Sequence, residues 1–273
     1  MKPEETKFAE WLAAEQAFGC EFTSFERIAA GKSSFNYKAV TPDGHRYFVK
    51  ITKPYRIDRI LARVGVISSP LIPGLAFGGK VGSFGKDAIC AIDWCERGEN
   101  IPPHLLTTAQ MKAICEGYRE ISRALSAVDH SGLSKMDGME EAAKKCGITP
   151  RPIHGDFHYQ NYYLHDGVLS ACYDMECMRL GLPTEDLLRI FVHAIERTRF
   201  WRLHRLNVLY KNLTEMVRVS DYPKSAWLAA VEIYRRYKTG RRLEKSSYPI
   251  IVKIDNWFRA PYYRRFRRAV EEA

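Results

Sequence analysis

Four side chains of kinds that take part in catalysis lie close together in the stretch RPIHGDFHYQNYYL: His154, Asp156, His158 and Asn161. Two chemistries use such a set. Because alternate residues of a strand share one face, His154, Asp156 and His158 could bind a metal ion such as zinc. On a loop, Asp156 would instead meet a substrate hydroxyl and Asn161 a magnesium ion, with Gly155 permitting a sharp bend. The stretch alone leaves both hypotheses open beside that of an ordinary polar turn.

The segments that follow predict that this stretch is a loop before a β-hairpin. NYYL and VLSACYDME are typical of two short strands, and His165, Asp166 and Gly167 form the turn between them. The hairpin reverses the chain, so Asp174 is expected to lie beside Asn161. Their carboxylate and amide oxygens are hard ligands that suit Mg²⁺, which also binds substrate phosphates.

The first 95 residues carry strand patterns and a lysine. SSFNYKAV and HRYFVKI flank a Pro-Asp-Gly turn, GGKVGSF and DAICAIDW predict a second antiparallel pair, and a short helix is expected over 57–64. Lys50 in the strand YFVKI offers a fixed positive charge to a phosphate, while Ser33 and Ser34 place backbone N–H groups over the same phosphates. Together with the loop, these residues predict a phosphoryl-transfer site.

From residue 96 onward the pattern becomes helical. A helix capped by Thr107 or Thr108 is predicted from apolar residues at three- and four-residue steps, namely Met111, Ile114, Tyr118, Ile121, Leu125 and Val128. Two more helices are predicted from the core-facing stripes Leu203, Leu206, Tyr210, Leu213 and Val217, and Trp227, Val231 and Tyr234. The predicted fold class is therefore α+β.

Two segments resemble the aminoglycoside phosphotransferase and choline kinase-like family, which has the protein-kinase fold. HGDFHYQN is similar to the family's HGDxHxxN catalytic loop, and YDMECMRLGLPTEDL to its D-x-E metal-binding segment with the following G-x-P-x-x-D-L. FVKI and GKSSFNYKAV match the small-lobe elements more loosely. The resemblance covers about residues 25–190. It implies a two-lobed fold: a nucleotide-binding lobe with a small antiparallel sheet over 1–95, and a mainly helical lobe over 96–273 with the catalytic loop and acceptor site.

The resemblance implies a role for each matching residue. Asp156 would position the acceptor and take the proton of its hydroxyl. Asn161 and Asp174 would hold Mg²⁺, and Lys50 would contact the α- and β-phosphates of ATP. Supporting roles fall to His154, His158, Glu176 and Asp186.

Among the supporting residues, His154 would shape the loop, and Asp186 would tie the start of the next helix to it. The segment AIDWCERG looks like the hinge between the lobes, where backbone groups of Asp93 and Cys95 would bind adenine.

The predicted function is an ATP- and Mg²⁺-dependent kinase of a small-molecule hydroxyl. The chain departs from the family pattern because RIDRILARV offers only Asp58, and no Glu, to pair with Lys50, and because Gly31 is the lone glycine of the phosphate loop. A nucleotide-binding pseudokinase is therefore an alternative. A metal-dependent hydrolase that uses His154, Asp156 and His158 as ligands is an alternative of another class. The short segment after Asp174 disfavours protein substrates.

Charge is unevenly distributed along the chain. Residues 197–273 contain 19 Lys and Arg against 7 Asp and Glu, a net charge of +12, whereas the remainder carries −2. This excess favours an acidic sugar or an envelope glycan as acceptor, with a choline-like amino alcohol or an aminoglycoside as the alternative. The ending APYYRRFRRAVEEA predicts a helix with Tyr262, Phe266 and Val270 on one face. That helix is either packed and solvated, or a peripheral contact for an anionic membrane or glycan.

Other features of the composition narrow the class of protein. The charged start MKPEETKFAEW and the lack of a long apolar run predict a cytoplasmic protein. The seven cysteines show no CxxC spacing, which favours reduced and mostly buried thiols. The chain contains no Walker A pattern and no nucleic-acid-binding motif, so no nucleic-acid partner is expected.

Overall fold

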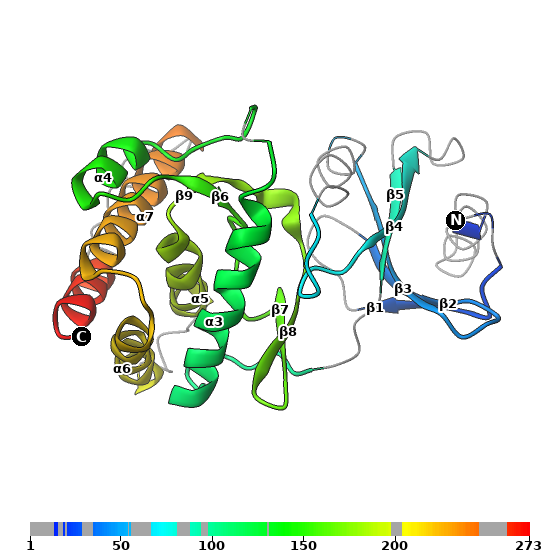
Figure 1. The fold of residues 1–273 in the computed structure, drawn as a ribbon, viewed down its shortest axis with the longest axis horizontal. Coiled ribbons are helices and arrows are strands. Elements are labelled where there is room, and N and C mark those ends of the chain that lie inside the picture. Colours follow the sequence, from blue (N-terminus) through cyan, green and yellow to red (C-terminus); the bar gives the residue numbers. More distant parts are fainter. Residues whose placement is uncertain are drawn as a thin grey trace. The chain divides into compact units, whose positions relative to one another are not determined.

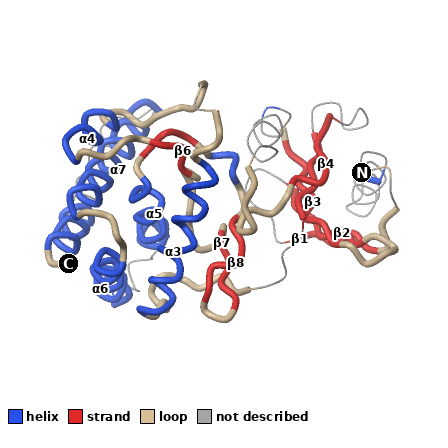
Figure 2. The backbone as a smooth tube through the Cα atoms, in the orientation of Figure 1, coloured by secondary structure: helices blue, strands red, loops and turns tan. Residues whose placement is uncertain are grey.

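The chain divides, in the computed structural model, into two units that have different secondary structure, Met1–Glu96 and Arg97–Ala273. Figure 2 shows that strands dominate the first unit and helices the second. The structure describes residues 14–15, 19, 21–28, 35–53, 55, 67–80, 88–93, 98–129, 131–197, 204–245 and 261–273. The α+β class and the kinase-like division into a small sheet and a helical part are both confirmed.

Five antiparallel strands form one sheet in the first unit, in the order β1-β2-β3-β5-β4 (Figure 1). They are β1 (Ser24–Ile28), β2 (Phe35–Val40), β3 (Arg46–Thr52), β4 (Leu75–Lys80) and β5 (Ala88–Asp93). The predicted hairpin is confirmed, because Thr41 N donates to His45 O and Gly44, at φ +83°, donates to Thr41 O. β4 pairs with β5 as predicted, although β4 begins at Leu75, before the predicted segment GGKVGSF, and residues 81–87 lie outside the described residues. The helix predicted over 57–64 lies outside the described residues.

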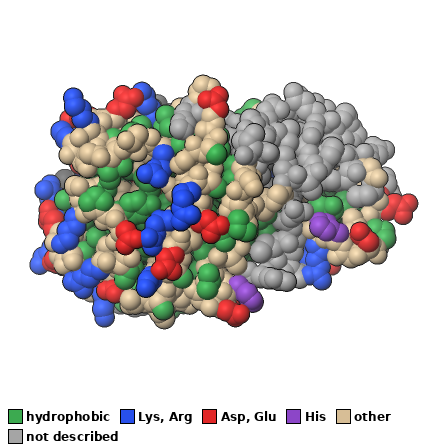
Figure 3. Space-filling model, in the orientation of Figure 1, with side chains coloured by type: hydrophobic (Ala, Val, Ile, Leu, Met, Phe, Trp, Pro, Cys, Tyr) green, Lys and Arg blue, Asp and Glu red, His purple; other side chains and the backbone are tan. Residues whose placement is uncertain are grey.

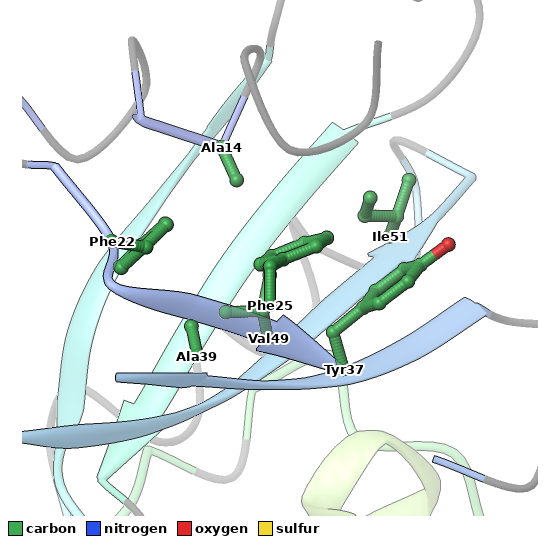
Figure 4. Packing of buried hydrophobic residues seen from close by; sticks show 7 residues of the cluster. All are labelled: Ala14, Phe22, Phe25, Tyr37, Ala39, Val49 and Ile51. Atoms are coloured by element: carbon green, nitrogen blue, oxygen red, sulfur yellow. The ribbon is translucent and has the colours of Figure 1, made fainter. Parts of the chain in front are cut away.

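Aromatic and aliphatic side chains fill one face of this sheet, as Figure 4 shows. Phe25 of β1 stacks on Tyr37 of β2 with ring centroids 4.3 Å apart, and Val49 and Ile51 of β3 lie in the same cluster. Such offset aromatic pairs add to the stabilisation from apolar burial. Lys50 projects from the opposite face of β3, because successive side chains of a strand alternate. It is only 6% exposed.

Four long helices form most of the second unit (Figure 1). They are α3 (Thr108–Leu125), α5 (Pro183–Arg197), α6 (His204–Val219) and α7 (Lys224–Lys245). The predicted start of α3 is confirmed by a capping box, in which Thr107 Oγ1 accepts from Gln110 N and Gln110 Oε1 accepts from Thr107 N. The predicted apolar stripe of α3 is buried, and so are the stripe residues of α6 and α7 that the structure describes.

Short elements complete the second unit. The hairpin predicted after the polar stretch is β7 (Tyr162–His165) and β8 (Val168–Cys172), with Asp166 and Gly167 at its turn. The sequence analysis did not predict the helix α4 (Met139–Cys146) or the pairing of β6 (Arg151–Ile153) with β9 (Arg179–Gly181). The 3₁₀ turn η2 (Met175–Cys177) precedes β9.

The basic C-terminal segment forms the predicted helix over residues 261–271. Phe266 and Val270 are buried, and Tyr210 of α6 packs edge-on against Phe266. Thr214 Oγ1 donates to Ala269 O, which adds a polar contact between the two helices. These contacts favour the packed, solvated helix of the two interpretations. None of the helices among the described residues is both long and apolar enough to cross a membrane.

Candidate active site

A buried carboxylate holds the polar stretch in one conformation. Asp186, in the first turn of α5, is fully buried. Its Oδ2 accepts from His154 N at 2.7 Å and its Oδ1 from Gly155 N at 2.8 Å. Tyr118 of α3 also donates its hydroxyl to Oδ2, at 2.6 Å. Two consecutive backbone N–H groups are therefore bound by one side chain, which sets the direction of the chain just before Asp156.

The structure places His154, Asp156 and His158 on a loop, so the hypothesis of a metal site on one face of a strand is wrong. The His154 ring is fully buried, and both of its nitrogens have partners. Nδ1 accepts from Asp156 N at 3.2 Å, and Nε2 lies 2.7 Å from Tyr173 O, to which it donates. His154 therefore shapes the loop and has no lone pair to give a metal ion. Among the described residues, no three His, Cys, Asp or Glu side chains cluster as metal ligands.

Gly155 permits a backbone conformation that other residues would not fit. Its φ is +82°, and a Cβ atom added there would lie 2.1 Å from Cys177 O. Both the left-handed backbone and the close approach of η2 therefore require glycine at this position.

We expect Gly155→Ala to displace the catalytic loop. The left-handed backbone costs an alanine about 1 kcal/mol, and the clash with a backbone carbonyl raises the total loss of unfolding free energy to about 2 kcal/mol or more. Gly167→Ala is the matched control, because Gly167 has φ +78° but no atom within 4 Å of an added Cβ. Chemical denaturation of both variants measures the difference, and equal losses would contradict the steric part of this prediction.

The β7–β8 hairpin brings the two predicted magnesium ligands together. Tyr173 N donates to Asn161 O at 2.8 Å, so Asp174 follows directly after a residue bonded to Asn161. Asn161 Nδ2 donates to Asp156 O at 2.9 Å, which turns its Oδ1 away from that contact. Asp174 itself has φ +70°, a conformation that is uncommon outside glycine and asparagine and that often marks functional sites.

Asp156 is bound at one carboxylate oxygen, lies near a histidine ring at the other, and remains 26% exposed. Arg189 Nε donates to Oδ1 at 2.8 Å, and His158 Nε2 lies 3.6 Å from Oδ2. Burial raises the pKa of Asp156, but the adjacent His158 ring and the Arg189 charge outweigh burial and hold this pKa well below its ordinary value. A carboxyl group with this pKa is ionised at neutral pH and can accept a hydrogen bond from a hydroxyl group.

The sequence analysis missed three residues of this site: Tyr118, Arg189 and His193. Asp186, Arg189 and His193 stand at positions i, i+3 and i+7 of EDLLRIFVH, which is one face of a helix. Once Asp186 was expected to bind the loop, this spacing could have indicated that Arg189 and His193 face the loop too. Tyr118 had no comparable signal, because it fits the apolar stripe of α3.

The remaining predicted residues belong to other elements than the polar loop. Lys50 lies on β3 of the first unit, opposite Asn36 and Cys90 of the neighbouring strands. Asp93 ends β5, while Ser33, Ser34 and Cys95 lie outside the described residues. Glu176 lies in η2, two residues after Asp174.

The fold and this loop define a class: the chain has the protein-kinase-like fold of the aminoglycoside phosphotransferases. No family model and no curated protein matches the sequence. Solved structures do match over almost the whole chain. The resemblance inferred from the two motifs is thus confirmed at the level of the fold.

Three similar structures illustrate the match. An amicoumacin kinase, hAmiN, in complex with AMP-PNP, Ca²⁺ and Ami has a TM-score of 0.57 at 11% identity, covering 99% of this chain and 96% of its own. A thermostable mutant of aminoglycoside phosphotransferase APH(4)-Ia, in a complex with AMP-PNP and hygromycin B, has a TM-score of 0.54 at 15% identity. The match covers 97% of this chain and 98% of that one. The GDP complex of an aminoglycoside 2'-phosphotransferase-IIIa mutant has a TM-score of 0.51 at 14% identity. The match covers 94% of this chain and 99% of that one.

Proposed function

We propose that this protein is an ATP- and Mg²⁺-dependent phosphotransferase that phosphorylates a hydroxyl group of a small molecule. The observation that carries the proposal is the placement of Asp156, which is part exposed, bound by Arg189 at Oδ1, and carried on a loop whose backbone is bonded to Asp186. The fold supports it, since similar structures hold AMP-PNP with hygromycin B or amicoumacin. ATP is the expected donor, and the cytoplasm, where ATP is available, is the proposed location.

In this mechanism the acceptor hydroxyl donates its proton to Asp156 as its oxygen attacks the γ-phosphorus in line, and ADP leaves. Catalysis of this transfer rests on positioning and on neutralising charge. The bonds from the loop to Asp186 give Asp156 a fixed place. Its low pKa keeps it ionised, so that it can accept a hydrogen bond from the acceptor hydroxyl before each turnover. Lys50 would supply a positive charge to the α- and β-phosphates.

The residues present fit a magnesium ion. The contact between Asn161 Nδ2 and Asp156 O leaves the amide Oδ1 as the atom that would bind the ion, and the bond from Tyr173 N to Asn161 O brings the backbone of Asp174 close to Asn161. Two protein oxygens complemented by phosphate oxygens are a usual set for Mg²⁺. When bound, the ion would neutralise charge on the phosphates. Glu176 would support this site from η2.

The acceptor is the finer part of the proposal, and two observations favour different classes. The net charge of +12 over 197–273 favours an acidic sugar or an envelope glycan. That support is weaker than the count suggests, because arginines pair with glutamates on their own helices: Arg235 and Arg236 with Glu232, Arg267 with Glu271, and Arg268 with Glu272. In Figure 3, basic and acidic side chains likewise lie close to one another over the second unit.

Near the catalytic loop the local charge differs from this regional charge. Glu196 lies 3.4 Å from the guanidinium that binds Asp156, and Asp174 and Glu176 follow the same loop in the site. These carboxylates support the alternative acceptor, an amine-bearing alcohol such as a choline-like amino alcohol or an aminoglycoside. Their support is also reduced by pairing, because Glu196 contacts Arg189 and Asp174 is assigned to Mg²⁺.

The test is an ADP-formation screen with purified protein, ATP and Mg²⁺ over four acceptor classes: acidic sugars, neutral sugars, amino alcohols and aminoglycosides. Acceptor-dependent ADP formation with a phosphorylated product supports the proposal. Nucleotide binding with no turnover on any acceptor would favour the pseudokinase, and zinc that copurifies with no nucleotide binding would favour the hydrolase.

We expect Asp174→Asn to weaken Mg²⁺-dependent nucleotide binding about tenfold or more, which corresponds to about 1.4 kcal/mol. Asparagine tolerates the left-handed backbone of Asp174, so the variant removes charge and little else. The matched control is Asp166→Asn, because Asp166 also has a positive φ, at +49°, in the same hairpin but is exposed. Calorimetry with and without Mg²⁺ measures the effect. Equal affinity in both variants would contradict the assignment of Asp174.

A further inference from the structure

Arg189 reaches the catalytic loop from the helix that also carries the loop-binding Asp186. Its Nε donates to Asp156 Oδ1 at 2.8 Å, and its Nη1 lies 3.4 Å from Glu196 Oε2. The Arg189 side chain is only 14% exposed. Because the guanidinium is planar, contacts at both ends fix its plane as well as its position. Glu196 thus orients the group that orients Asp156.

A second contact from α5 approaches the other carboxylate oxygen. The His193 ring stacks on the His158 ring at 3.8 Å with an interplanar angle of 5°. His158 Nδ1 accepts from Gln160 N, which leaves the hydrogen on Nε2, the atom 3.6 Å from Asp156 Oδ2. Arg189 and His193 are one helical turn apart, so α5 holds the carboxylate on one oxygen and buttresses the ring beside the other.

We propose that Arg189 is a positioning residue for phosphoryl transfer. By binding Oδ1 at 2.8 Å, it fixes the plane of the carboxylate and prevents it from rotating, so that Oδ2, the less engaged oxygen, can accept the proton of the acceptor hydroxyl. Oδ2 has two acceptor sites, so the distant His158 N–H does not fill it. The inference rests on the proposed function, because it assigns Arg189 a role only if Asp156 meets the acceptor.

The arrangement predicts a specific dependence on the shape of the guanidinium. The ammonium group of a lysine is a single point of charge and cannot contact Asp156 and Glu196 from two ends of one plane. Arg189→Lys would therefore keep the charge and lose the orientation. Arg189→Met keeps most of the side-chain volume and loses both. Residues that orient a metal ligand from the outer shell typically contribute about 10- to 100-fold to activity, and we expect the same range for Arg189, which orients a reacting carboxylate.

The experiment compares steady-state kinetics of Arg189→Met, Arg189→Lys and Arg189→Ala with the wild type, using any acceptor that turns over. We expect Arg189→Met to lower kcat roughly 10- to 100-fold, with the KM for ATP unchanged. We expect Arg189→Lys to lie between it and the wild type. Millimolar guanidinium should restore part of the turnover of Arg189→Ala, whereas the same concentration of NaCl should not. Arg218→Met is the control, because Arg218 is exposed on α6 and contacts Glu215 and the backbone carbonyl groups of Glu272 and Ala273, away from the catalytic loop.

The outcomes separate the inference from the proposed function. If Asp156→Asn is inactive while Arg189→Met keeps the wild-type kcat, the inference is overturned and the function stands. A loss of kcat accompanied by an equal loss of ATP affinity, with no rescue by guanidinium, would also overturn it, because a general loss of structure gives that result. If Asp156→Asn turns over like the wild type, Asp156 is not the proton acceptor and the inference falls with it. If the wild type turns over no acceptor at all, the proposed function itself fails. If Arg189→Met does not fold, Arg189→Lys still tests the inference. A kcat of Arg189→Lys equal to that of the wild type would exclude the positioning role.

Discussion

Asp156→Asn is expected to lower turnover about 1,000-fold while leaving ATP affinity nearly unchanged. A positioned proton acceptor contributes on the order of 100- to 10,000-fold to a reaction of this kind. The amide keeps the shape of the side chain, and its oxygen can still accept from Arg189 Nε, so the loop should hold its conformation. The variant thus removes the proton acceptor and little of the structure around it. Single-turnover kinetics with saturating ATP and acceptor measure the effect on the chemical step.

Two measurements guard this prediction against a trivial result. Thermal unfolding with and without nucleotide shows whether Asp156→Asn folds and binds ATP. Glu116→Gln provides a control for the loss of one carboxylate, because Glu116 is exposed on α3 and lies 3.9 Å from Lys112. Loss of ATP affinity with unchanged turnover would contradict the role of Asp156. It would indicate that Asp156 binds the nucleotide and not the acceptor.

The sequence predicted that Asn161 and Asp174 approach one another, because the hairpin that joins them is formed by residues close together in the chain. A two-strand hairpin returns Asp174 to Asn161 whatever surrounds it, and its turn has the composition that such turns require. The same holds for β2 and β3 and for α3, where the capping residues and the apolar steps agree. Each of these elements is specified by neighbours within about 20 residues.

Contacts between distant segments were not predictable in the same way. β6 and β9 have three residues each, too few to show a period, and they pair because Asp186 and the buried Arg179–Glu185 ion pair fix the segments beside them. α4 has eight residues and begins after a glycine with no side-chain cap. Arg189 is ambiguous in sequence, since an arginine on an amphipathic helix is usually solvated. Only the observed ion pair with Asp156 shows its direction.

Asp186 explains how such a short loop keeps its conformation, and its removal should have the largest effect on stability. Its carboxylate accepts three hydrogen bonds in a fully buried place: from His154 N, Gly155 N and the Tyr118 hydroxyl. Hydrogen bonds to a charged acceptor contribute about 1.5 to 3 kcal/mol each. The carboxylate is therefore the point at which α3, α5 and the catalytic loop are joined.

We expect Asp186→Asn to lower the free energy of unfolding by about 3 kcal/mol, although the amide has the same size as the carboxylate. An amide has one oxygen, so in either orientation its NH₂ group meets a backbone N–H: that of Gly155, or that of His154. One buried donor then loses its acceptor and faces another donor. Tyr118→Phe is the matched control, because it removes only the hydroxyl contact and leaves both backbone bonds, for a loss of about 1.5 kcal/mol. Denaturant titration of the two variants measures the difference. If Tyr118→Phe costs as much as Asp186→Asn, the backbone bonds contribute little and another contact must hold the loop. If Asp186→Asn also loses turnover under conditions where it is folded, the hydrogen bonds to residues 154 and 155 set the position of Asp156 as well as the stability of the chain.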